Sequence, residues 1–112
     1  MTYMQFDPND IFLKLEAAAE NMAVAESNAL RLEELKGVML AKISVEFRAQ
    51  GLGVGECELR AKADPRYSTH IEGMVVAKEK AIRARANYKD LTILAELRRT
   101  QESSARTMIE RR

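Results

Sequence analysis

Apolar residues recur along the first half of the chain at alternating steps of three and four. This is the spacing of one helix face, and it continues for about ten turns. The motif Asp7-Pro8-Asn9-Asp10 signals a helix start, because Asp and Asn side chains accept hydrogen bonds from free backbone amides and proline fits the first turn. We predict a first helix over about residues 9–50. Its apolar seam comprises Ile11, Leu15, Ala18, Met22, Ala25, Ala29, Leu32, Leu35, Met39, Ile43 and Phe47.

Three glycines between Gly51 and Gly55 interrupt the helical pattern. Because glycine readily adopts positive φ angles, they predict a sharp turn over about residues 51–56. A phosphate-binding loop is also glycine-rich, but no strand pattern precedes this segment and no Gly-Lys-Ser/Thr ending follows, so a plain turn is favoured. A short helix over about 56–63 follows, and Asp64-Pro65 then repeats the signal that opens a helix.

The second long helix, over about residues 65–110, has a seam of the same period that becomes polar at Arg98 and Gln101 before Ala105 and Met108. The apolar part of this seam comprises Tyr67, Ile71, Met74, Ala77, Ala81, Ala84, Tyr88, Leu91 and Ala95. Only 5% of the residues are aromatic and alanine is abundant, which indicates a thin, closely packed core. The predicted fold is all-α: a single-domain (1–112), long antiparallel helical hairpin resembling a coiled coil.

Both helices carry further apolar residues outside their seams. On the first helix these are Phe12, Val24, Leu30, Val38, Leu40 and Val45, and on the second Val75, Ile82, Ile93, Leu94 and Leu97. A lone hairpin leaves these side chains uncovered, and apolar surface of this extent is normally buried against a partner. We therefore expect a homo-oligomeric helical bundle, a dimer or larger. The candidate interface residues are Val75, Ile82, Leu94 and Leu97.

The net charge of +1 hides a division between the two halves. Residues 1–56 have a net charge of −4, and residues 57–112 have 13 basic and 8 acidic residues, a net charge of +5. Two helices of opposite charge attracting each other explain this division, and a basic face that contacts phosphate is the alternative. No DNA-reading motif is present. Candidate contacts to a partner or to nucleic acid are Arg83, Arg85, Lys89, Arg98, Arg99, Gln101 and Arg106.

The residue types that carry catalysis are sparse. His70 is the only histidine and Cys57 the only cysteine, so His clusters and Cys-x-x-Cys zinc motifs do not occur. Glu16 and Glu20 have the spacing of di-iron carboxylates, but the Glu-x-x-His partner motif is missing. We expect a protein without catalytic, metal or cofactor sites. The lone cysteine, a start without signal-peptide features and short apolar runs favour a cytoplasmic protein outside the membrane.

The segment from Ala63 to Ile109 carries a series of motifs, in the order Asp64-Pro65-x-Tyr67, His70-x-x-Gly73, an Ala/Arg-rich tract leading to Tyr88, and Arg99-Thr100-Gln101. In this it resembles small uncharacterised helical phage and prophage proteins from early genome regions that encode recombination, replication and anti-defence functions. Arg98 stands where that group has a tryptophan. The resemblance implies a non-enzymatic accessory protein that binds and modulates a nucleic-acid-processing or host-defence complex. The alternative is direct, non-specific DNA or RNA binding by the basic second helix.

Overall fold

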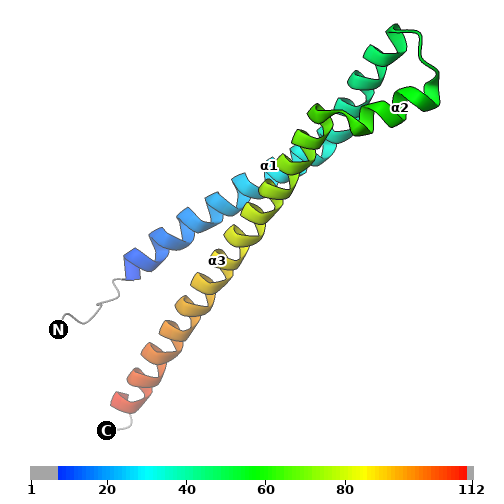
Figure 1. Ribbon diagram of the computed structural model, residues 1–112. Helices are drawn as coiled ribbons and strands as arrows, with labels where there is room; N and C mark the ends of the chain where they lie inside the picture. Colours follow the sequence, from blue (N-terminus) through cyan, green and yellow to red (C-terminus); the bar gives the residue numbers. More distant parts are fainter. Residues whose placement is uncertain (1–7, 111–112) are drawn as a thin grey trace, which may run out of the picture. The chain divides into compact units, whose positions relative to one another are not determined.

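The computed structural model describes residues 8–110, which form three α-helices (Figure 1). Helix α1 spans Pro8–Ala49, α2 spans Val54–Ala63 and α3 spans Pro65–Glu110. These residues contain no strand, so the all-α prediction is confirmed. Helix α2 begins two residues earlier than predicted, and Asp7 of the expected helix-start motif lies outside the described residues.

The chain divides into two compact units, and both long helices contribute to each. One unit is Val24–Ala81, which holds the end of α1, the glycine-rich turn, α2 and the start of α3; we call it the turn unit. The other consists of Met1–Ala23 and Ile82–Arg112, and we call it the end unit.

The chain reverses in the turn unit immediately after α1. The backbone N–H of Gln50 donates to Phe47 O at 3.0 Å, and that of Gly51 donates to Arg48 O at the same distance. Gly51 has a φ of 89°, which an L side chain rarely adopts, so a glycine is required at this position. The backbone N–H of Cys57 then donates to Gly53 O at 2.9 Å in the first turn of α2.

A single residue, Asp64, separates α2 from α3. Its backbone N–H donates to Ala61 O at 3.2 Å, and its carboxylate Oδ1 accepts from the backbone N–H of Arg66 at 2.8 Å. Pro65, the first residue of α3, has no N–H to satisfy and presets the helical φ angle. The predicted Asp-Pro helix start is thus formed by backbone and side-chain hydrogen bonds of one residue.

The helices of the turn unit pack through small side chains. Its buried residues are Ala29, Ile43, Cys57, Ala61, Met74 and Ala77. Ile43 is the only large side chain that is fully buried among the described residues. Ion pairs join Glu46 to Arg66 and Glu33 to Lys78, so residue numbers fall along α1 as they rise along α3. The long helices are therefore antiparallel in this unit.

The seam of α1 is buried or half-buried as predicted, except at Leu35, which is 42% exposed. At 100° per residue, Met39 lies only about 20° around the helix from Leu32, whereas Leu35 lies about 60° away. Leu32 and Met39 therefore lie on the buried face of α1, whereas Leu35 lies at the edge of that face. Of the apolar residues placed outside the seam, Leu40 is half-buried and the others are exposed.

The end unit has a smaller core. Ile11 and Ala18 are its only buried residues among the side chains described. In this unit the seam of α3 is half-buried at each predicted position from Ala84 to Arg98, and every residue from Arg99 to Glu110 is exposed. The apolar seam expected to resume at Ala105 and Met108 is therefore uncovered. The described part of α1 begins at Pro8 and provides no cover for these positions.

Candidate interaction surfaces

The basic residues singled out in α3 differ in their surroundings. Arg98 is half-buried, and the other candidates are exposed: Arg83, Arg85, Lys89, Arg99, Gln101 and Arg106. Arg98 and Arg99 line a common hollow, so the polar interruption of the seam lies beside the start of α1. The structure thus brings two candidates together and leaves most of the others along the solvent-facing parts of α3.

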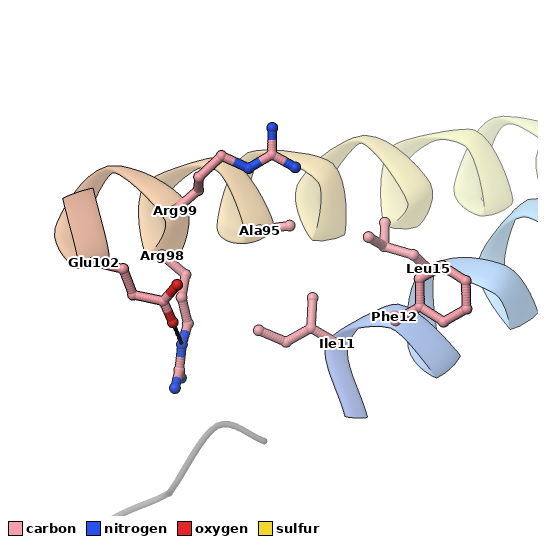
Figure 2. A pocket seen from close by; sticks show the side chains of 7 residues that line it. All are labelled: Ile11, Phe12, Leu15, Ala95, Arg98, Arg99 and Glu102. Atoms are coloured by element: carbon pink, nitrogen blue, oxygen red, sulfur yellow. Dashed lines mark hydrogen bonds and ion pairs between the residues drawn. The ribbon is translucent and has the colours of Figure 1, made fainter. Parts of the chain in front are cut away.

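The hollow in the end unit has a volume of about 210 Å³ (Figure 2). Ile11, Phe12 and Leu15 of α1 give it an apolar lining, and α3 contributes Ala95, Arg98, Arg99 and Glu102. The Nε of Arg98 donates to Glu102 Oε1 at 3.4 Å, one turn further along α3. The hollow thus combines an apolar lining with the guanidinium of Arg98, which is paired with the Glu102 carboxylate (Figure 2). Guanidinium groups bind carboxylate and phosphate through parallel hydrogen bonds.

The four residues proposed as an oligomer interface are all solvent-exposed. Their exposed fractions range from 38% for Leu94 to 69% for Ile82, with Val75 and Leu97 between these values. Packing within the described chain therefore does not explain why these positions are apolar. Exposed apolar residues of this number are typical of a surface that binds another protein.

His70 joins the two long helices of the turn unit. Its Nε2 donates to the backbone carbonyl of Leu32 at 2.8 Å, and the ring is half-buried. The contact links residues 38 positions apart and fixes the register of α3 on α1. This hydrogen bond gives the only histidine a contact between the helices, and the sequence did not identify its partner.

Cys57 is buried where α2 follows the glycine-rich turn. Its Sγ donates to Leu52 O at 3.5 Å, so the thiol ties α2 to the preceding loop. Among residues 8–110, no group of three or more His, Cys, Asp or Glu side chains is arranged to hold a metal ion. Cys57 thus has a packing and hydrogen-bonding role at the start of α2.

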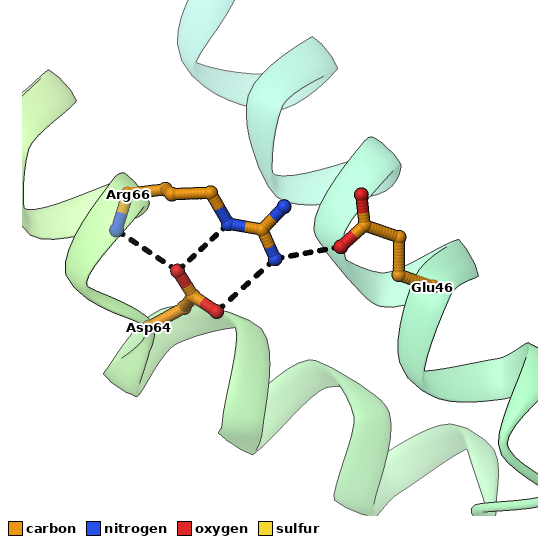
Figure 3. Close-up of polar contacts among 3 residues, drawn as sticks. All are labelled: Glu46, Asp64 and Arg66. Atoms are coloured by element: carbon orange, nitrogen blue, oxygen red, sulfur yellow. Dashed lines mark hydrogen bonds and ion pairs between the residues drawn. The ribbon is translucent and has the colours of Figure 1, made fainter.

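Arg66 bridges two acidic side chains of the turn unit (Figure 3). Its Nη2 lies 2.7 Å from Glu46 Oε2, and its Nε lies 3.0 Å from Asp64 Oδ1. Hydrogen bonds from the Arg66 side chain lower the pKa of Glu46, and they lower the pKa of Asp64 together with the Arg66 backbone N–H. The same contacts raise the pKa of Arg66.

Sequence reasoning identified Asp64 as a helix start but missed this three-residue cluster. The contact between Glu46 and Arg66 depends on the register of α1 on α3, because the two residues are 20 positions apart in the sequence. The opposite charges of Glu46 and Arg66 on either side of the turn were the available signal. These charges identify Glu46 and Arg66 as partners only when the length of the turn between the helices is known.

A second surface, also missed, lies on α1 in the turn unit. A hollow of about 430 Å³ is lined by Gly37, Leu40, Ala41, Ser44, Val45 and Arg48 of α1 and by Val54, Cys57 and Glu58 of α2. A further hollow of about 480 Å³ is lined by Val38, Ala41, Lys42, Val45 and Glu46. Ala41 and Val45 belong to both. A mid-helix glycine beside apolar residues outside the seam was the sequence signal for this surface.

None of the helices within residues 8–110 combines the length and apolar character that crossing a membrane requires. Comparison with protein-family models, curated proteins and solved structures finds no match to this chain. The resemblance of the segment from Ala63 to Ile109 to phage proteins thus rests on the residues of that segment alone.

Proposed function

We propose that this protein is a non-enzymatic helical binding module, which self-associates and modulates another protein complex by contact. The observation that carries this proposal is the imbalance between buried and exposed apolar side chains. Only Ile43 is fully buried among the large residues described, whereas Phe12, Val45 and Ile82 are each more than 60% exposed. Burial of apolar surface must offset the entropy lost when helices become ordered, so association with another chain supplies the missing burial.

The resemblance to early-region phage proteins supports a more specific role. In this proposal the module acts in the cytoplasm on a nucleic-acid-processing or host-defence complex. Arg98 and Arg99, beside the apolar lining of the end-unit hollow, contact an acidic group of that complex. Exposed apolar residues of α3, including Ile82 and Leu97, add contact area to the interface with that complex.

A pull-down from host extract tests this role, with nuclease-treated and untreated samples compared. The double variant Arg98→Ala/Arg99→Ala is expected to lose the partner while keeping its melting temperature and oligomer size. Lys36→Ala, an exposed cationic position on α1, is the matched control and retains the partner. If the double variant unfolds or dissociates and its folded remainder still binds the partner, these arginines are structural. Partner binding that survives in a folded double variant likewise contradicts the proposed contact.

Direct nucleic-acid binding is the second candidate, favoured by the exposure of Arg83, Lys89, Arg99 and Arg106 on the net-positive half of the chain. Phosphate contacts release counterions, so such binding weakens steeply between 50 and 200 mM salt. Fluorescence anisotropy with a labelled DNA duplex and a single-stranded RNA measures this dependence. Arg83→Ala/Lys89→Ala is expected to reduce the salt slope by about two if these side chains contact phosphate.

A further inference from the structure

One face of α1 in the turn unit points away from the buried seam. Gly37, Ala41 and Val45 follow one another along it at steps of four residues, and Val45 is 67% exposed. At 100° per residue, Ala41 lies about 160° around the helix from the buried Ile43. No residue of α3 lines the hollows on this face, which we call the Ala41 face, and α2 borders only one of them.

The Ala41 face is shaped to receive another helix. The two α1 hollows described above share Ala41 and Val45, and α2 borders one of them. A Cβ placed on Gly37 would have nothing within 4 Å, so the backbone there is open to an approaching side chain. Small residues at a contact allow two helix backbones to come close together.

Residues at equal distances before and after Ala41 are complementary in size. Four residues away lie Gly37 on one side and Val45 on the other, and three residues away lie Val38 and Ser44. If two copies of α1 pack antiparallel about a two-fold axis at Ala41, each Val45 projects toward the Gly37 of the other copy. Each Val38 meets a Ser44 in the same way. At both spacings, three and four residues from Ala41, a larger side chain is thus opposite a smaller one.

The charges on this face follow the same symmetry. Glu34 and Arg48 are both exposed and lie seven residues before and after Ala41. The antiparallel arrangement places each Glu34 opposite the Arg48 of the other copy, whereas a parallel one places like charges together. Arg48 Nη1 also donates to Leu52 O at 3.3 Å, which holds this side chain near the turn. Guanidinium and carboxylate are well matched for such pairing.

We infer that the Ala41 face binds a second copy of the chain, with the two α1 helices antiparallel about a two-fold axis at Ala41. The inference rests on the proposed self-association and assigns it a site. It places the dimer contact on α1, so the exposed apolar residues of α3 are available to a different protein. The interface is isologous, meaning that the same surface is used by both copies.

Charge reversal at the two ends of this face tests the arrangement. Glu34→Arg and Arg48→Glu each place like charges together at two positions of the dimer, and each is expected to weaken dimerisation at least about tenfold. The double variant Glu34→Arg/Arg48→Glu restores both pairs and returns the dissociation constant to within about threefold of the original. Sedimentation velocity gives the constants, and far-UV circular dichroism verifies that each variant remains helical.

A cross-linking variant tests the same register without relying on charge. Ala41→Cys places two thiols next to the two-fold axis, and mild oxidation is expected to yield a covalent dimer. Lys36→Cys is the matched control, because it lies about 140° around α1 from Ala41 and is expected to remain uncross-linked. The native Cys57 is present in both variants and is buried.

The outcomes separate this inference from the proposed function. Rescue by the double reversal and selective cross-linking at position 41 support the Ala41 interface. Unchanged dimerisation in the single reversals, or a double variant no better than the singles, overturns the interface while self-association stands. Dissociation by Ile82→Gln/Leu97→Gln alone instead places the contact on α3 and also overturns it. A wild-type chain that remains monomeric throughout overturns both proposals.

Discussion

The turn unit and the end unit are built from the same two long helices but hold them together differently. Six buried residues and contacts between α1 and α3, including Glu46 with Arg66 and His70 with Leu32 O, stabilise the turn unit. In the end unit Ile11 and Ala18 are buried, and the ion pairs of Lys14 with Asp10 and Arg98 with Glu102 lie within single helices. Pairs of this second kind contribute little to tertiary structure.

An unbroken helical pattern thus runs through two units that differ in side-chain burial. Helical propensity and an apolar seam extend through both units. The turn unit nevertheless has six buried residues among those described, and the end unit has two. Helices depend mainly on tertiary packing for their stability, so the turn unit is expected to direct folding. We therefore expect the end unit to depend more on the partner protein proposed to contact Arg98 and Arg99.

The largest predicted difference between the units concerns their two buried isoleucines. Ile43→Ala is expected to lower the free energy of unfolding by about 2–5 kcal/mol, because its side chain is 1% exposed and its loss leaves a cavity. Ile11 lines an open hollow, so Ile11→Ala is expected to cost about 2 kcal/mol or less. Urea unfolding at one protein concentration, followed by circular dichroism, measures both. Equal losses would mean that the two cores are equally well packed.

A pair of glycine variants sharpens the description of the turn unit. Gly51→Ala is expected to destabilise the protein by about 1–2 kcal/mol, because its φ of 89° places a Cβ near the following carbonyl. Gly73→Ala has the opposite prediction, a stabilisation of up to about 1 kcal/mol, since α3 is helical there and nothing lies within 4 Å of the added Cβ. Thermal unfolding of both variants checks the signs. Loss of stability in Gly73→Ala would reveal an additional contact at this position.

The smallest predicted effect is the pH dependence of the Arg66 cluster. The lowered pKa values of Glu46 and Asp64 mean that their contribution to stability is present above about pH 4 and is lost as pH falls through those values. Glu46→Gln is therefore expected to reduce the melting temperature at pH 6, with the difference from wild type shrinking toward pH 2. Glu33→Gln, which removes the carboxylate of the longer, 3.8 Å ion pair with Lys78, is the matched control on the same helix. A constant difference across this range would exclude an ionic origin.

The sequence predicted the helices and most of the seam because both depend on local spacing. The Gly51 turn and the Asp64-Pro65 start were also local signals, formed by residues within a few positions of each other. The contact of His70 with Leu32 O and the Arg66 bridge required the register of α3 on α1, which periodicity leaves undetermined. The exposure of Ala105 and Met108 is a tertiary property, which the spacing of apolar residues in α3 does not predict. Helical spacing alone indicates which face is apolar but does not identify what covers it.

Self-association is tested most directly by measuring molar mass and thermal unfolding over the same dilution series. Light scattering is expected to give a mass at least twice the 12.6 kDa of the single chain at micromolar concentrations. The melting temperature is expected to rise with chain concentration, because association stabilises the folded state by mass action. A cooperatively folded 12.6 kDa monomer at low micromolar concentration, with a melting temperature independent of concentration, would contradict the account.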